Sequence, residues 1–367
     1  VDGTVGLTTN GSGNATVVND AGLNFAASTV GRNLAATATT GNMTDSGALT
    51  IAGTSSFTTS ANNATIALDT TTNAFTGAVT ITTNDNSGTD ADVTIDGGTT
   101  ALILAASTID GDLTVRSGNA SGITDSGTVT VGGNLAATTD ANNGVINLGT
   151  LAVNGTIALA TNGSGNATVV NDAGLTFAAS TVGGNFAATA TTGNVTQSNG
   201  GGALSVTGTS SYTTSANNAY IALSYQTNAF TGAVSLNTTG SDGFARIDGG
   251  TTALDIAASS VGGWLMLTSG HASGITDSGT VTVGGNLIAT TDANSGVINL
   301  GTLAVDGTVQ LTTNGSGDAT VVNDAGLTFA ASTVRNLAAT ATTGNIVDNG
   351  VLTVAGTSSF TTSQNNA

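Results

Sequence analysis

The chain lacks cysteine, proline, lysine and glutamate throughout its 367 residues, and these absences narrow its fold class. Exposed helix faces depend on Lys, Glu and Arg, yet only 7% of the residues are charged. The absence of Cys excludes a disulfide framework and thiolate metal sites. Thr, Val, Asn and Gly dominate instead, and these residues favour strands and turns. The composition predicts an all-β chain.

Positive charge is also scarce. Four Arg stand against 22 acidic residues, all of them Asp, so the formal net charge is −18. Nucleic acids and anionic membrane surfaces call for clustered basic residues, and no apolar run is long enough to span a bilayer. We therefore expect no nucleic-acid partner and no membrane insertion.

Short alternating runs fill the chain in place of helices. Examples are Val129–Val131, Leu151–Val153 and Ile157–Leu159, which are separated by Gly- and Asn-rich pairs. Period-two alternation of Val, Ile, Leu and Thr between such turns is typical of β-strands. These strands are too short for the hairpins of a sandwich and suit the sides of a coil.

The sequence repeats itself with a long period of 152 residues. Asn10–Leu23 recurs unchanged at Asn162–Leu175, and Ser121–Leu135 recurs unchanged at Ser273–Leu287. The first, second and third copies are residues 1–152, 153–304 and 305–367. Because the sequence starts and stops within a copy, we expect it to be a segment of a longer protein.

Each copy divides further into units that resemble one another more loosely. We place six units of 22 to 29 residues in the second copy. A unit with three short strands and Gly/Asn corners is one rung of a parallel β-helix. We predict a right-handed helix of 14–15 rungs, with about 25 residues a rung and about 4.8 Å between rungs. Residues 1–367 would form a single continuous domain, whereas immunoglobulin-like modules would need longer strands.

Alternation assigns side chains to the inside or the outside of this coil. The predicted inward residues are Val281, Val283, Leu287, Ala289, Leu300, Leu303 and Val305. The predicted outward or corner residues are Thr282, Asn286, Thr290, Asn299 and Thr302. Aromatic residues at matched positions of the copies, predicted to fill the core, are Phe25, Phe177 and Phe329, and Phe57, Tyr212 and Phe360.

Three phrases resemble the shaft repeats of filamentous-haemagglutinin-type exoproteins, the secreted adhesins of two-partner secretion systems. They are Leu49–Gly53, Ile123–Val131 and Gly132–Leu135. The resemblance implies a right-handed β-helical shaft at the bacterial surface, acting in adhesion, aggregation or biofilm. That family's secretion domain carries Asn-Pro motifs, which this Pro-free chain lacks. A two-partner substrate and an autotransporter passenger remain equally compatible with the sequence.

Enzymatic chemistry finds little support. Catalytic β-helices need clustered carboxylates or a base beside a cation. The four Arg are Arg32, Arg116, Arg246 and Arg335. Arg32 and Arg116 are replaced by Gly184 and Thr268 in the second copy, so a site repeated in each copy is excluded, although a single unique site is not. His271 is matched by Asn119 and Trp264 by Asp112 in the first copy. We predict a non-enzymatic protein without catalytic residues.

Asp residues recur at the expected corners, in Asn-Asp-Ala-Gly and Thr-Asp-Ser-Gly phrases. They are Asp20, Asp172 and Asp324, and Asp125 and Asp277. The first interpretation is side-chain turn chemistry, and the second is Ca²⁺ bound between rungs. The most ligand-rich loop offers Asp85, Asp90 and Asp92 as calcium candidates. No other cofactor is indicated.

Together these features predict a non-enzymatic repeat shaft of a large surface or secreted adhesin, located outside the cell. Its partners would be surface glycans, surface proteins or other copies of itself. The alternative is a self-assembling subunit of an extracellular filament or sheath. A polysaccharide-active β-helix enzyme is a third and less favoured hypothesis.

Overall fold

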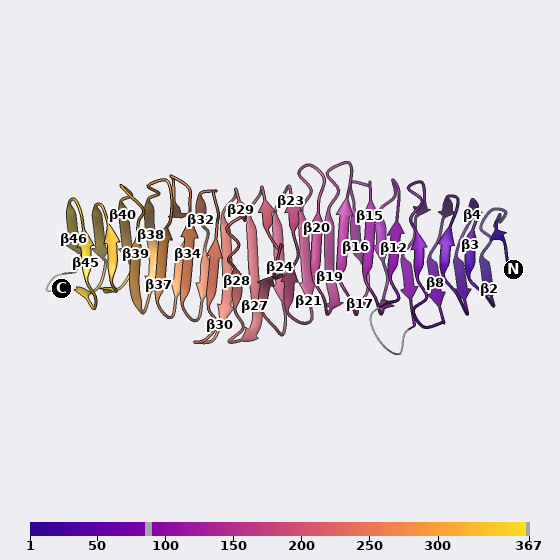
Figure 1. Ribbon diagram of the computed structural model, residues 1–367, viewed down its shortest axis with the longest axis horizontal. Coiled ribbons are helices and arrows are strands. Elements are labelled where there is room, and N and C mark those ends of the chain that lie inside the picture. Colours follow the sequence, from indigo (N-terminus) through magenta and orange to yellow (C-terminus); the bar gives the residue numbers. More distant parts are fainter. Residues whose placement is uncertain (85–89, 365–367) are drawn as a thin grey trace. The chain divides into compact units, whose positions relative to one another are not determined.

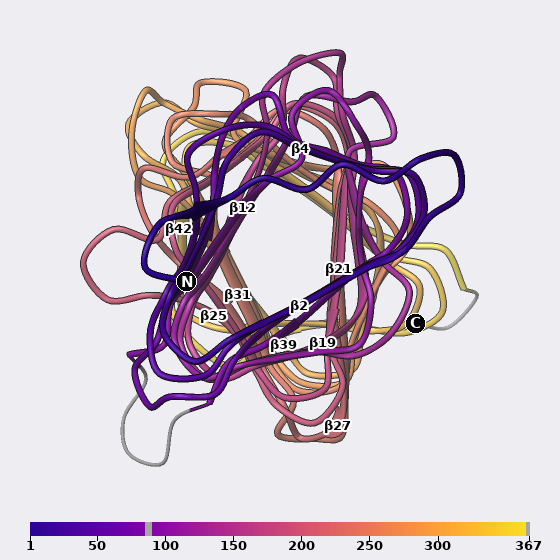
Figure 2. The ribbon, with the colours of Figure 1, turned by 90° about the vertical axis from the view of Figure 1, so that its right-hand side faces the viewer.

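The computed structural model describes residues 1–84 and 90–364 as an all-β solenoid without helices. Parallel strands stack in about 16 turns of about 22 residues. In the first unit the chain circles clockwise as it recedes from the N-terminus, so its winding is right-handed, as predicted (Figures 1 and 2). No helix in the described residues is long and apolar enough to cross a membrane.

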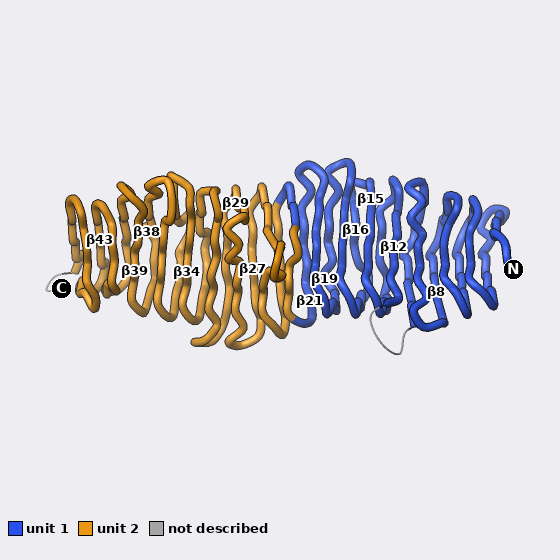
Figure 3. The backbone as a smooth tube through the Cα atoms, in the orientation of Figure 1, with its two compact units in different colours: residues 1–173, 180–184 blue, residues 174–179, 185–367 orange. Residues whose placement is uncertain are grey.

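The chain divides into two compact units, coloured separately in Figure 3. Unit 1 is residues 1–173 and 180–184, and unit 2 is residues 174–179 and 185–367. Each unit is built in the same way. A typical turn has three strands, as in β3 (Leu23–Phe25), β4 (Ser28–Val30) and β5 (Leu34–Ala38). They pair with β6 (Met43–Asp45), β7 (Leu49–Ile51) and β8 (Ser55–Thr59) of the next turn.

In unit 1 one face is a continuous parallel ladder. Its strands are β1 (Thr4–Val5), β3, β6 (Met43–Asp45), β9 (Ile66–Leu68), β12 (Val93–Asp96), β15 (Leu113–Ser117), β18 (Leu135–Thr139) and β20 (Ile157–Ala160). The other faces hold β2 (Ala15–Asn19), β4, β5, β7 (Leu49–Ile51), β8 (Ser55–Thr59), β10 (Ala74–Phe75), β11 (Val79–Thr82), β13 (Leu102–Leu104), β14 (Ser107–Ile109), β16 (Ile123–Asp125), β17 (Val129–Val131), β19 (Ile146–Val153), β21 (Ala167–Asn171) and β23 (Ser180–Val182).

In unit 2 the matching ladder has nine strands among the described residues. They are β22 (Leu175–Phe177), β25 (Val195–Gln197), β28 (Ile221–Leu223), β31 (Ala245–Asp248), β34 (Leu265–Ser269), β37 (Leu287–Thr291), β39 (Thr308–Thr312), β41 (Leu327–Phe329) and β44 (Ile346–Asp348). The other faces hold β24 (Phe186–Ala190), β26 (Leu204–Val206), β27 (Ser210–Asn217), β29 (Ala229–Phe230), β30 (Val234–Thr239), β32 (Leu254–Ile256), β33 (Ser259–Val261), β35 (Ile275–Asp277), β36 (Val281–Val283), β38 (Ile298–Val305), β40 (Ala319–Asn323), β42 (Ser332–Val334), β43 (Leu337–Ala341), β45 (Leu352–Val354) and β46 (Ser358–Thr362).

The predicted turn length was too long. Counted from β3, which begins at Leu23, seven ladder strands precede the equivalent Leu175, so a copy of 152 residues makes seven turns and not six. The error arose because the Leu-x-Val or Leu-x-Phe phrase recurs on different faces. Leu175 begins β22, which pairs with β25, whereas Leu204 begins β26, which pairs with β29. Inward positions on every face are occupied by the same apolar residue types. The phrase therefore does not identify a particular face of the turn.

The division into inward and outward side chains is confirmed. All seven predicted inward residues are at most 3% exposed. Thr282, Asn286, Asn299 and Thr302 are exposed, and Thr290 is half-buried. Alternate side chains of a strand point to opposite faces, so each turn adds one apolar layer to the interior.

Aromatic rings fill the core at the matched positions, with one exception. Phe57 packs edge-on against Phe75 at a ring separation of 5.8 Å, and Tyr212 packs edge-on against Phe186 at 5.7 Å. Phe360, at the equivalent position, is 49% exposed, since no described strand pairs with the far side of β46. The prediction of a core position is therefore wrong for Phe360 in this structure.

Glycine is required where neighbouring turns approach closely. Gly122 and Gly274 occupy equivalent corners with φ of 60° and 63°. A Cβ atom there would collide with the carbonyl oxygen of Val145 or Val297 in the next turn. Only glycine combines a left-handed backbone with so close an approach.

Candidate binding groove and the corners around it

The predicted calcium loop lies partly outside the described residues. Asp85 falls in the gap at 85–89, while Asp90 and Asp92 are described. The Asp92 carboxylate accepts a 2.8 Å hydrogen bond from the amide of Asp112, one turn further along. Within the described residues no three His, Cys, Asp or Glu side chains gather as metal ligands. Calcium binding at this loop stays a prediction.

The corner aspartates join one turn to the next. Asp125 accepts hydrogen bonds from the amides of Gly149 and Thr150, at 3.0 and 2.6 Å, and from the Thr150 hydroxyl at 2.8 Å. Asp277 binds Gly301 and Thr302 in the same way. These bonds reach the next turn, so they differ from the local side-chain turn of the first interpretation, and the second interpretation, Ca²⁺ between rungs, stays a prediction.

A buried asparagine at the same place in each copy performs a related task. Asn171 accepts a 2.8 Å bond from the Val153 amide and donates a 3.0 Å bond to the Val153 carbonyl. Asn323 pairs with Val305 in the same way. The amide side chain thus acts as one more backbone unit where the strand register shifts between Leu148 and Leu151.

His271 fills a turn position and shows no catalytic partner among the described residues. Its Nδ1 accepts a 3.0 Å hydrogen bond from the Ser273 amide. The equivalent Asn119 accepts a 2.9 Å bond from the Ser121 amide through Oδ1. The histidine therefore replaces an asparagine in the same turn.

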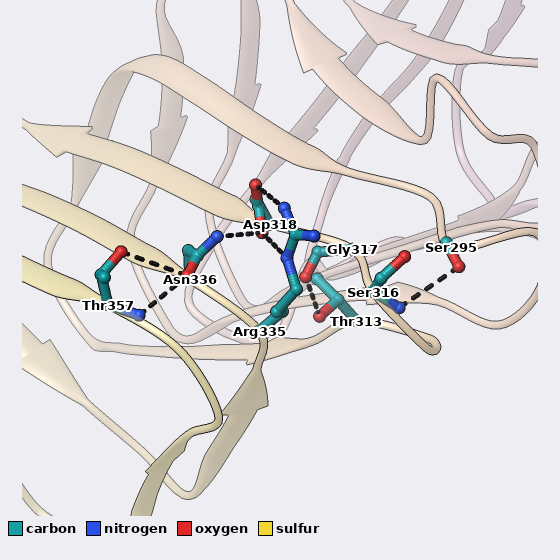
Figure 4. A network of polar contacts seen from close by, with 8 residues as sticks. All are labelled: Ser295, Thr313, Ser316, Gly317, Asp318, Arg335, Asn336 and Thr357. Carbon is teal, nitrogen blue, oxygen red and sulfur yellow. Dashed lines mark hydrogen bonds and ion pairs between the residues drawn. The ribbon is translucent and has the colours of Figure 1, made fainter.

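One Arg of the four forms an ion pair in the described part of the chain. Arg335 meets Asp318 with two hydrogen bonds of 2.7 Å, and Asn336 donates to the same carboxylate (Figure 4). The hydrogen bond from Arg335 lowers the pKa of Asp318. Asp318 stands where the first two copies have Asn14 and Asn166. Because the pair is exposed, it contributes little to stability.

Three aromatic side chains stack on the outside of unit 2. Tyr220, Phe244 and Trp264 precede β28, β31 and β34, with ring separations of 4.6 and 4.2 Å and interplanar angles of 4° and 5°. These separations follow the spacing of adjacent strands. The rings are partly exposed. The stack is a surface feature, and Trp264 is its last ring.

A groove of about 380 Å³ lies beside this stack, entirely within unit 2. Its floor is formed by outward residues of four paired strands, which run from Thr176 through Thr196 and Ala222 to Arg246. Tyr220 and Tyr225 also line it. The remaining lining residues are Gln197, Ser198, Asn199 and Ser224. No carboxylate is among the lining residues.

The loop at one edge of the groove is held in place by hydrogen bonds. The Tyr225 hydroxyl donates to the Ser198 carbonyl at 2.6 Å and accepts from the amides of Gly200 and Gly201 at 2.6 and 3.2 Å. Gln197 donates from Nε2 to the Gly202 carbonyl at 2.5 Å. This edge is therefore shaped before any ligand arrives.

The floor of the groove is largely shielded from solvent by the surrounding side chains. Ala222 faces outward in the middle of β28, yet it is only 7% exposed. Its equivalent Ala67 in the first copy is half-buried. Arg246 is exposed, and the described residues place no carboxylate in an ion pair with it. The groove thus offers a free guanidinium beside aromatic, amide and hydroxyl groups.

Sequence reasoning missed this groove, although it noted single differences between the copies. Trp264 was set against Asp112 and used as an argument against a repeated site. The sequence-based prediction of site residues includes none of Tyr220, Tyr225 and Arg246. The available signal was the clustering of the differences. It becomes visible only when the turn register places Tyr220, Arg246 and Gln197 side by side.

Two buried carboxylates lie at equivalent corners outside the groove. Asp96 and Asp248 accept hydrogen bonds from the amides of Gly98 and Gly250 at 2.7 and 2.8 Å. Burial raises the pKa of Asp248, and the Gly250 amide opposes that shift only in part. Burial raises the pKa of Asp96 for the same reason.

The fold and its regular corners define the chain as a tandem-repeat parallel β-solenoid. Three stretches, residues 12–82, 164–237 and 316–367, match a family described as "Repeats of unknown function (DUF5649)". Together they make up more than half of the chain, so the chain belongs to this family. The matches begin 152 residues apart, which is the long period of the sequence.

No curated protein and no solved structure matches the chain. The family is defined by its repeats, and its description assigns no activity. The resemblance to filamentous-haemagglutinin-type shafts therefore stays a prediction.

Proposed function

We propose that the chain is a non-enzymatic shaft segment of a large secreted or surface adhesin, which presents its outer faces to partners outside the cell. The observation that supports the proposal is that polar side chains at the corners hydrogen-bond to the neighbouring turn. Corner groups such as Asp125, Asp277 and Asn171 are engaged in bonds between turns. The chemistry of the corners thus serves a repetitive scaffold.

The composition supports the same role. Apolar layers of Val, Leu, Ile and Phe continue through both units. Burial of such layers supplies most of the stability of a solenoid, because each turn contacts mainly its neighbours. Charge contributes little, since one exposed ion pair is formed in the described residues. A scaffold of this kind suits an environment in which pH and salt vary.

The location can be tested on intact producing cells. We expect an antibody against the chain to label unpermeabilised cells, and protease added outside to remove the signal. Labelling that requires permeabilisation would contradict the proposal. Deletion of the chain should reduce adhesion or aggregation if the shaft acts as we propose, and unchanged adhesion and aggregation would count against that role.

Two other hypotheses predict different results. A self-assembling filament subunit would form polymers longer than one chain in negative-stain electron microscopy, whereas a shaft segment would form separate particles. Repeating the imaging with Ca²⁺ tests the loop at Asp90 and Asp92. A polysaccharide-active enzyme would release new reducing ends from acidic polysaccharides, and we expect none.

A further inference from the structure

The groove of unit 2 differs from the equivalent face of the first copy in a consistent direction. Asp45, Asp69, Asp92 and Asp112 of the first copy are replaced by Gln197, Ser224, Phe244 and Trp264. Thr65, Thr70 and Thr94 are replaced by Tyr220, Tyr225 and Arg246. Four carboxylates are lost, one guanidinium is gained, and four aromatic rings are added. Although the chain has a net charge of −18, this face has lost negative charge and gained a positive group, so it repels an anion less than the first-copy face does.

We propose that this groove binds a saccharide unit that carries a carboxylate, such as a uronic acid within an oligosaccharide. The carboxylate pairs with Arg246, and the sugar ring lies against Tyr220 and Tyr225. The inference depends on the groove and not on the cell-surface role proposed above, so either can fail without the other.

The aromatic and amide groups match the two kinds of surface on a sugar. A pyranose ring presents a patch of C–H groups on its faces and hydroxyl groups around its rim. Aromatic side chains supply apolar area together with a polar tip. Ser198, Asn199 and Ser224 line the groove with side chains that carry hydrogen-bond donors and acceptors. A cavity of about 380 Å³ falls within the usual range for small-ligand sites, and it suits one or two sugar rings.

Arg246 determines the preference for an acidic sugar. A guanidinium binds a carboxylate through two parallel hydrogen bonds, which are stronger than neutral ones. Arg246 is exposed and unpaired with any carboxylate in the described residues, so no internal ion pair has to be broken. The Asp residues that would repel an anion on the first copy are replaced around the groove.

The test is calorimetric titration of the full chain with tetramers of galacturonate and of mannuronate, each beside its fully methyl-esterified form. We expect saturable binding of at least one acidic tetramer, and at least tenfold weaker binding of its ester. Arg246→Thr, which restores the first-copy residue, should weaken binding of the acid at least tenfold. Tyr220→Thr should weaken binding of both the acid and the ester.

The matched control is Arg116→Thr, which removes an exposed Arg from the same kind of face in the first copy. It should leave binding unchanged. Both Arg side chains are exposed, so we expect each variant to fold like the parent chain. The unfolding midpoint of each variant checks this. The proposal is overturned if neither acid binds, if acid and ester bind equally, or if Arg116→Thr weakens binding as much as Arg246→Thr.

Discussion

The first and second copies share the alternating pattern of their core, and one outer corner shows how their surfaces differ. In the first copy Asp92 binds the amide of Asp112, and Asp112 binds the amide of Asn134 at 2.6 Å. In the second copy the corresponding corners carry Phe244 and Trp264, which stack at 4.2 Å. One scaffold therefore closes the same corner with charge–amide hydrogen bonds in one copy and with ring stacking in the other. The outer face is free to change because the inner face holds the fold.

The largest expected effect tests the shared core. Leu287 is fully buried in β37, so Leu287→Asp should cost several kcal/mol and prevent cooperative folding, because it buries an unpaired charge. Asn286→Ser removes bonds of 2.8 and 3.0 Å from Thr308 and should cost only about 1 kcal/mol. Urea unfolding monitored by circular dichroism measures both. Equal midpoints would contradict the inward assignment of Leu287.

Asn171 tests the buried amide that the copies have in common. Asn171→Ala leaves the amide and carbonyl of Val153 without partners, which should cost about 1–3 kcal/mol. Asn323→Ala should cost a similar amount at Val305. Chemical denaturation compares the two variants with the parent chain. A loss below about 0.5 kcal/mol in both would show that these bonds do not matter to stability.

The corner itself is tested by restoring first-copy residues. Phe244→Asp breaks two ring stacks and should cost about 1–3 kcal/mol, since a stacked pair contributes about 0.5–1.5 kcal/mol. Adding Trp264→Asp should recover part of the loss, because the Asp112 carboxylate accepts a bond from the Asn134 amide in the first copy, and a carboxylate at position 264 can accept one from the equivalent Asn286 amide. A double-mutant cycle from unfolding midpoints measures this coupling. Strictly additive losses would argue against interchangeable corners.

Tyr212 offers a smaller comparison inside the core. It replaces Phe57, and its buried hydroxyl has no hydrogen bond of ordinary geometry in the described residues, although Ser210 lies near. Tyr212→Phe should therefore stabilise the chain by about 1 kcal/mol. Burial raises the pKa of Tyr212, so the parent chain should lose stability above pH 10 through this group. The Tyr212→Phe variant should lose less stability than the parent chain above pH 10. Thermal unfolding at several pH values measures this, and an identical alkaline loss in both chains would contradict the prediction.

The smallest effect concerns the carboxylates that both copies share. Burial raises the pKa of Asp248, so the folded chain holds a proton more tightly than the unfolded chain does. This group therefore stabilises less as pH rises above its ordinary pKa of 3.8. Asp248→Asn keeps the acceptor for Gly250 and should raise the melting temperature slightly at pH 7 but not at pH 3. Asp96→Asn should change the melting temperature in the same direction. Changes of opposite sign in the two variants would contradict the explanation by burial.

The sequence predicted the solenoid because its main signals are local. Alternation identified Val281, Leu287 and Val305 as inward, and the structure buries them. The turn length could not be read in the same way, because Leu175 and Leu204 begin similar phrases on different faces. The groove depends on the same register. Gln197, Tyr220 and Arg246 are far apart in sequence and become neighbours only when successive turns are stacked correctly.

The central claim is that one face of the second copy has acquired a binding site that the repeated scaffold lacks elsewhere. The stoichiometry of acidic-oligosaccharide binding tests it most directly. Calorimetry of the full chain should give one site per chain, and replacing Gln197, Tyr220, Tyr225 and Arg246 by Asp, Thr, Thr and Thr should abolish that site without lowering the unfolding midpoint by more than a few degrees. Two or three equivalent sites per chain would contradict the claim, because binding would then belong to features that every copy repeats.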